Sequence, residues 1–214
     1  MSIQNIVNKA TFLTVDKRKV SAQTITRSGR VRTAEVASAV PYRFAFGVTS
    51  GYKYSENRSN LEELDRLDIT TEEEINIGTS NTGLNYITAY QGDSTGIGSI
   101  TITGSSAATL ILNCSNAGSG TFLFKKGDFI QPATGYRYPY QVTADVAHTT
   151  ANPVTIPIHR PFIEQTGYSI NGKTLKVGTA VSWFVKMVNK PSYTILPHDR
   201  LQIDADIEVV EIIL

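Results

Sequence analysis

The stretch FLFKKGDFIQPATGYRYPYQVTADVAHTTANPVTIPIHRPFI, residues 122–163, decides the fold class, because short apolar runs alternate in it with turn residues. Between Phe124 and Phe129 the sequence KKGD predicts a tight turn in which Gly127 supplies a positive φ. A turn between two short apolar runs is typical of antiparallel β-structure rather than of helices.

Two further strands follow in the same stretch. Residues 138–146 alternate apolar with polar positions, which is the pattern of a strand with one buried face. Residues 154–158 predict another strand, and Pro157 restricts it to a sheet edge or a bulge because proline cannot donate a ladder hydrogen bond. The stretch therefore predicts part of a β-barrel or sandwich.

Similar patterns extend over most of the chain. The residue pair Asn171-Gly172 predicts a hairpin, and Trp183, the single tryptophan, is expected in the core. Short strands separated by turn residues every 8 to 12 positions predict an all-β fold, mainly an antiparallel barrel or sandwich. The other predicted strands cover residues 40–48, 70–77, 84–91, 97–103, 181–188 and 201–214.

One short helix is expected near residues 57–67. Ser59 and Glu62 have the spacing of a capping box, and Leu61, Leu64 and Leu67 recur every third position. Such a helix packs a narrow apolar stripe on a sheet and exposes its charges, which is the simplest interpretation of its acidic residues.

Composition argues against several classes of partner. A net charge of +1 over 214 residues and a pI of about 7.8 lack the basic excess of a nucleic-acid or anionic-membrane binder. No run of 18 apolar residues and no secretion signal is present, so we expect no membrane partner and folding in a cytoplasm. Cys114, the single cysteine, is expected to be a buried small hydrophobe.

Charge is biased in two segments only. Residues 17–43 carry seven Lys and Arg against one acid, and residues 1–40 are expected to form an extended arm attached to a single β-rich domain, residues 41–214. The acidic run Glu72-Glu73-Glu74 has no basic neighbour in the sequence. The basic arm is interpreted either as solvated or as docked on an acidic neighbouring subunit, where it could pair with this run.

A search for catalytic chemistry returns no motif. GxSxG and HExxH are absent, and no spacing singles out a carboxylate pair, a metal site or a cofactor site. The three histidines, His148, His159 and His198, lie far apart near prolines, so they are interpreted as loop residues. We therefore expect a non-enzyme. One alternative is a carbohydrate-binding receptor module that presents Tyr136, Tyr138 and Tyr140, although burial of these rings is the simpler interpretation.

Several segments together resemble a known class. KKGDFIQPATGYRYPYQVTADV, TIPIHRPFI, TITRSGRVRTAE, PYRFAF, LEELDRLDITTEEEINI, LNYITAYQGD and KPSYTILPHDRLQIDADIEVVEIIL are similar to patterns in tail and baseplate proteins of long-tailed bacteriophages, especially those of cyanobacteria. The resemblance covers most of the chain but carries over no catalytic or ligand residue.

This resemblance implies a ring-forming virion protein, assembled in the host cytoplasm, of the baseplate hub, tube-initiator or distal-tail type. Its implied partners are copies of itself and other tail or baseplate proteins, with passive contact to DNA in the tail lumen. A head-tail connector or capsid-decorating protein is a further alternative. Because the chain ends on apolar residues, we expect that end to be buried in its own sheet or against another subunit. The expected interface residues are Arg27, Arg30, Arg32, Glu72, Glu73, Glu74, Ile212, Ile213 and Leu214.

Overall fold

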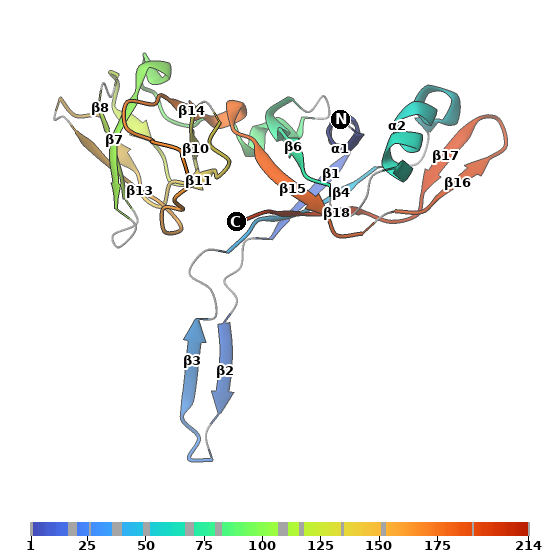
Figure 1. Cartoon of the computed structure of the whole chain (residues 1–214), viewed down its shortest axis with the longest axis horizontal. Helices are drawn as coiled ribbons and strands as arrows, with labels where there is room; N and C mark the ends of the chain where they lie inside the picture. Colours follow the sequence, from blue (N-terminus) through green and yellow to red (C-terminus); the bar gives the residue numbers. More distant parts are fainter. Residues whose placement is uncertain are drawn as a thin grey trace.

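In the computed structural model, the described part of the chain consists mainly of short antiparallel strands, with two α-helices and a few single turns of 3₁₀-helix (Figure 1). The all-β prediction is confirmed. The structure describes residues 2–16, 21–25, 27–35, 40–48, 52–66, 71–79, 83–106, 111–115, 118–133, 135–150, 153–189 and 191–213.

The largest sheet has five strands and runs through the middle of the molecule. On β4 the side chains of Phe44 and Phe46 are buried whereas Arg43 is exposed, as the alternation in the sequence predicts. The sheet thus has an inner face toward a core and an outer face. Its strands, in spatial order, are β1 (Phe12–Asp16), β4 (Arg43–Gly47), β18 (Ile207–Glu211), β15 (Trp183–Met187) and β6 (Glu73–Ile75).

The start of the chain belongs to this sheet and its core. Ile3, Ile6 and Val7 of α1 (Ser2–Val7) are buried at helical spacing, and β1 pairs antiparallel with β4 over its whole length. The prediction of an extended arm over residues 1–40 is therefore wrong for residues 2–16. The full first core comprises Ile3, Ile6, Val7, Ala10, Tyr42, Phe44, Phe46, Leu64, Ile75, Ile77, Phe129, Val181, Trp183, Val185, Met187, Ile207 and Val209.

The remaining part of the predicted arm contains a β-hairpin. Strands β2 (Ser21–Ile25) and β3 (Val31–Glu35) pair antiparallel from Ser21 opposite Glu35 to Ile25 opposite Val31. Gly29 at the turn has a φ of 75°, a conformation that favours glycine. The hairpin projects away from the rest of the molecule (Figure 1).

A second core lies at one end of the long axis, on the left in Figure 1, beside the central sheet. Three small antiparallel sheets surround it. The first contains β7 (Thr101–Ser106), β8 (Ile111–Ser115) and β13 (Val154–Pro157); the second β9 (Phe122–Phe124) and β12 (Val146–Ala147); the third β10 (Phe129–Pro132), β11 (Tyr140–Gln141) and β14 (Leu175–Val177). The core residues are Ile100, Ile102, Cys114, Leu123, Phe124, Ile130, Tyr136, Tyr138, Tyr140, Val142, Val146, Val154, Ile156, Ile158, Phe162 and Leu175.

The structure of residues 122–163 agrees in part with the prediction. Gly127 turns the chain with a φ of 106°, and β13, which contains Pro157, is an edge strand. The prediction of a single strand over residues 138–146 is wrong. Pro139 has no N–H to donate, so pairing begins at Tyr140, and the chain bends again after Val142, whose N–H donates to the Asp128 carbonyl at 2.9 Å.

Other predicted strands are replaced by tighter turns. Residues 84–91 contain η2 (Leu84–Ile87) and residues 97–103 begin with η3 (Ile97–Ser99), because Gly83 and Gly96 enter these segments with positive φ. Two more single turns are η1 (Ile77–Thr79) and η4 (Gly178–Ala180). Asn171-Gly172 forms the predicted turn, but β14 beyond it pairs with β10 and not with the residues before the turn.

The helix expected near residues 57–67 is α2 (Tyr54–Arg66), with Leu61 and Leu64 buried. It lies beside another three-stranded sheet, which contains β16 (Tyr193–Leu196), β17 (Arg200–Ile203) and β5 (Tyr52–Lys53). Because the helix begins before Ser59, the predicted capping box falls inside it and is wrong. Leu67 lies outside the described residues.

The N-terminus of α2 is instead capped by Asp199 from the tip of the β16–β17 hairpin. Its Oδ1 accepts a 2.8 Å hydrogen bond from the Ser55 N–H, and its Oδ2 accepts one from the Ser55 hydroxyl. These bonds, the hydroxyl bond first, lower the pKa of Asp199. The cap thus joins two elements that are distant in the sequence.

This cap predicts a pH-dependent stability. A carboxyl whose folded pKa is lowered stabilises the protein above its unfolded pKa, and this stability is lost as the pH falls through the folded pKa. We expect Asp199→Asn to lower the melting temperature near neutral pH and to have a smaller effect at about pH 2, measured by circular dichroism. Asn is chosen because it tolerates the φ of 61° found at Asp199. An equal effect at both pH values would contradict this role.

Candidate assembly interface

A buried ion pair joins the two halves of the molecule. Arg160, which follows β13, donates from Nη1 and Nη2 to the two carboxylate oxygens of Glu211 on β18 at 2.7 and 2.6 Å. The side chains are 1% and 0% exposed. The Arg160 guanidinium lies 5.5 Å from the ring centres of both Tyr42 and Tyr140, which belong to the first and second core.

The surroundings of this pair favour the charged form of Arg160. Burial would lower the pKa of Arg160, but hydrogen bonds and the negative charge of Glu211 raise it overall. Arg160 Nη2 also donates to the Pro139 carbonyl at 2.8 Å, and Glu211 Oε2 accepts from the Tyr42 N–H at 3.0 Å. This buried ion pair and its further hydrogen bonds link the first core to the second.

The tyrosines considered for carbohydrate binding are all buried. Tyr136, Tyr138 and Tyr140 are 2%, 2% and 0% exposed. The hydroxyls of Tyr136 and Tyr140 are 2.7 Å apart, and both rings stack on Phe162 at 5.5 and 5.7 Å between centres. Burial also raises the pKa of Tyr140 to about 12. These rings fill the second core and offer no surface to a sugar.

The acidic run has partners within its own chain. Glu72 forms ion pairs with Arg137 at 2.9 Å and with Lys186 at 3.7 Å. Glu73 accepts from the Ile3 N–H at 3.0 Å, and Glu74 accepts from the Ser182 hydroxyl at 2.5 Å. The premise that this run lacks partners in its own chain is therefore wrong, because residues remote in sequence supply two cations to Glu72 and neutral hydrogen-bond donors to Glu73 and Glu74.

The basic interface residues lie on the hairpin. Arg27 and Arg30 are exposed at its turn, and Arg32 lies in β3. The structure brings these residues together but does not bring them near β6, which lies on the body (Figure 1). Beside them Ile25 is 73% exposed, an apolar residue that sequence reasoning did not single out. The position of Ile25 just before a turn was the one feature of the sequence that could have indicated its exposure.

The end of the chain extends the large sheet. After β18, Ile212 and Ile213 are half-buried, and the Ile212 N–H donates to the Phe184 carbonyl at 2.9 Å. Of the two environments expected for the end of the chain, its own sheet or another subunit, the first thus applies in part to these two residues. Leu214 lies outside the described residues.

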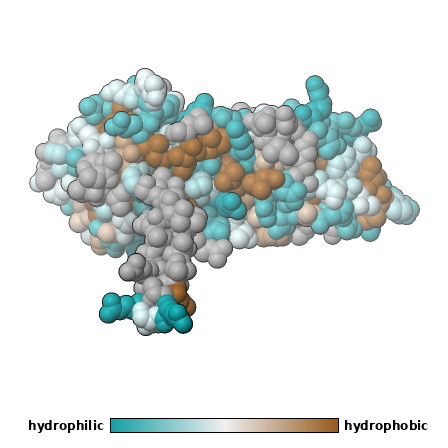
Figure 2. All heavy atoms as spheres, turned by 60° about the horizontal axis from the view of Figure 1, so that its bottom comes forward, coloured by the Kyte–Doolittle hydropathy of each residue, from teal (hydrophilic) through white to brown (hydrophobic). Residues whose placement is uncertain are grey.

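The outer face of the large sheet contains a hollow of about 200 Å³. Figure 2 shows apolar atoms gathered on the face of the body from which the hairpin projects. Val188, which is 45% exposed, lines the hollow together with charged side chains from three strands. The lining residues include Thr14, Asp16, Arg43, Ala45, Val188 and Glu208.

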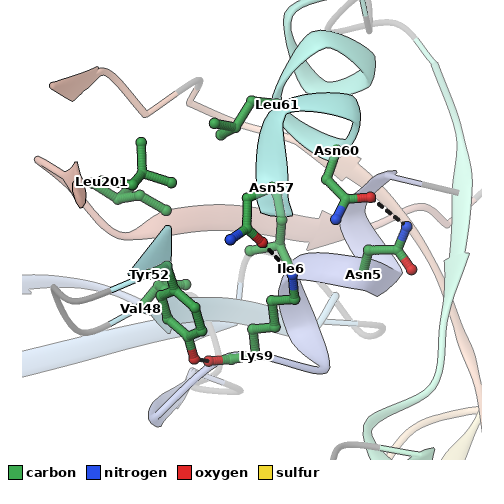
Figure 3. Close-up of a pocket in the computed structure, with 10 residues that line it drawn as sticks. Asn5, Ile6, Lys9, Val48, Tyr52, Asn57, Asn60, Leu61 and Leu201 are labelled. Atoms are coloured by element: carbon green, nitrogen blue, oxygen red, sulfur yellow. Dashed lines mark hydrogen bonds between the residues drawn. The ribbon is translucent and has the colours of Figure 1, made fainter. Parts of the chain in front are cut away.

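Two other hollows among the described residues are small or shallow. Between α1, α2 and β17 a space of about 20 Å³ is closed by hydrogen bonds from Asn5 to Asn60 at 2.9 Å and from Tyr52 to the Lys9 carbonyl at 2.8 Å (Figure 3). It has room for about one water molecule. A shallow polar hollow of about 530 Å³ follows the loop of residues 164–171.

Potential reactive side chains are likewise dispersed. Cys114 is buried, which raises the pKa of its thiol to about 12 and makes it a poor nucleophile. Within the described ranges no three His, Cys, Asp or Glu side chains are placed to hold a metal ion. None of the helices in that part of the chain is long and apolar enough to cross a membrane.

No protein-family model matches this chain, and no curated protein matches it.

Proposed function

We propose that this chain is a non-enzymatic structural subunit of a bacteriophage tail, which assembles with copies of itself into a ring and joins the tail tube to the baseplate. The observation that carries the proposal is the β2–β3 hairpin, which projects from a body that is otherwise closed around two cores (Figure 1).

A projecting hairpin has little stability of its own unless another polypeptide packs against it. A two-stranded hairpin alone in water is at best marginally stable, and its outer edges present unpaired backbone groups. This one also carries Ile25, 73% exposed, next to its turn. Packing against another polypeptide would remove these costs, which is the arrangement expected of an assembly subunit.

The place in the virion follows from the sequence resemblance. Tail-tube, hub and distal-tail proteins are rings of β-rich subunits, and the described part of this chain is an all-β body with a protruding segment. Under this proposal the protein is located in the virion tail after assembly in the host cytoplasm. Its partners are further copies of the chain and the adjoining tail or baseplate proteins.

The proposal predicts the result of removing the hairpin. In the variant, residues 17–39 are replaced by a short Gly-Ser linker, which leaves α1, β1 and β4 in place. We expect the full chain to form a closed oligomer and the variant to remain a folded monomer, measured by native mass spectrometry and circular dichroism.

The control is the full chain with Arg58→Glu and Glu62→Arg, two exposed residues of α2. It should assemble as the unaltered chain does. A full chain that stays monomeric at concentrations of about 100 μM, well above the dissociation constants of stable complexes, would contradict the proposed function.

A further inference from the structure

The hollow on the outer face of the large sheet combines an apolar wall with an unbalanced negative charge. On β18, Ile207 and Val209 are buried and Glu208 between them is exposed, so Glu208 points to the outer face. Val188, also exposed, lies in the same hollow. The hollow therefore offers a place for an apolar group beside a carboxylate.

The other two charges in the hollow balance each other. Asp16 on β1 and Arg43 on β4 are directly opposite in the strand pairing, and opposite residues of an antiparallel pair share a face. Among the described residues the Glu208 side chain has no hydrogen bond or ion pair, and Asp206, two positions earlier, is also exposed. The net charge that remains is negative.

The hairpin carries the complementary pair of groups. Ile25 ends β2, and Arg27 follows two residues later with an exposed side chain. Arg27 has no described partner within the chain. An apolar side chain and a guanidinium at this spacing match the apolar wall formed by Val188 and the carboxylate of Glu208.

The hairpin does not occupy the hollow of its own chain, because its tip points away from the body (Figure 1). We propose that the hollow receives the hairpin tip of a second copy, with Ile25 against Val188 and Arg27 paired with Glu208. This inference rests on the proposed self-assembly and identifies its contact. Tip and hollow are different patches of one surface, so copies joined head to tail through this contact form a ring when the rotation per subunit closes the circle.

The test is a charge reversal with rescue in the full chain. Arg27→Glu or Glu208→Arg alone is expected to raise the protein concentration at half-assembly about tenfold, because an attraction becomes a repulsion of similar size. The double variant Arg27→Glu with Glu208→Arg restores the attraction, and its half-assembly concentration should return to within about twofold of the original. Sedimentation velocity over a dilution series measures all three.

Two controls make the result specific. Arg58→Glu and Glu62→Arg carry the same charge changes on α2 and should leave assembly unchanged. A cysteine pair, Ile25→Cys with Val188→Cys, should form disulfide-linked chains under mild oxidation, whereas the native Cys114 is buried and should not take part. Each variant is checked for the original circular dichroism spectrum.

The outcomes separate the inference from the proposed function. If the single reversals assemble normally, or the double variant is as weak as the singles, the docking contact is wrong even when removal of the hairpin abolishes assembly. If the full chain is monomeric throughout the dilution series, both the contact and the proposed function are wrong.

Discussion

Replacement of Arg160 by methionine is expected to lower the free energy of unfolding by about 3–5 kcal/mol, the cost of breaking a buried ion pair. The variant leaves Glu211 buried without its counter-charge, while the Tyr42 N–H remains as a hydrogen-bond donor to it. Stability of typical domains is only about 5–15 kcal/mol, so the loss should be visible as a large shift in the urea midpoint, followed by the fluorescence of Trp183.

The matched control separates lost charge from lost packing. Arg160→Met combined with Glu211→Met removes both charges, and a well-packed apolar replacement of a buried pair is often neutral or stabilising. We expect the double variant to recover at least half of the loss.

An exposed ion pair serves as a second control. Lys53→Ala breaks a 3.2 Å ion pair with side chains 64% exposed and should lower the free energy of unfolding by about 0.5 kcal/mol or less. A loss of under about 1 kcal/mol for Arg160→Met would contradict the role of this pair in joining the cores.

Deletion of residues 2–16 is expected to prevent folding altogether. The segment buries Ile3, Ile6 and Val7, each worth about 1.5–3 kcal/mol as an upper estimate, and it supplies β1, the edge strand beside β4. The sum is comparable to the whole stability of a typical domain. The chain without these residues should show no cooperative unfolding transition in circular dichroism.

Removal of the hairpin is the matched comparison for this deletion. Both changes act on the first 40 positions, but the hairpin lies outside both cores. A truncated chain lacking residues 2–16 that unfolds cooperatively, with a midpoint near that of the full chain, would contradict the assignment of these residues to the first core.

The parts of the fold that were predictable depend on local patterns. The alternation around Phe44 and Phe46 identifies β4, the buried Trp183 follows from its strand context, and Pro157 correctly indicates an edge strand. In each case the side-chain period of a strand acts over a few residues. The same pattern failed in residues 84–91, where Tyr86 is 74% exposed and glycine geometry produces a single turn of helix instead.

The candidate interface was predictable only where it depends on neighbours in sequence. The exposed Arg27 and Arg30 lie close together in the chain, so their clustering was visible beforehand. Glu72 and Arg137 are 65 positions apart, and Arg160 and Glu211 are 51 apart. Pairings of this kind depend on how separate sheets pack, which single-sequence patterns do not encode. The hollow beside Glu208 likewise exists only once β1, β4 and β18 are adjacent.

The most direct test of the account is a cryo-electron microscopy reconstruction of the assembled full chain. We expect a closed ring in which strands β2 and β3 of each subunit contact the body of another copy. Density for the hairpin folded back on its own subunit, or subunits joined through other surfaces while the hairpin contacts solvent alone, would contradict it.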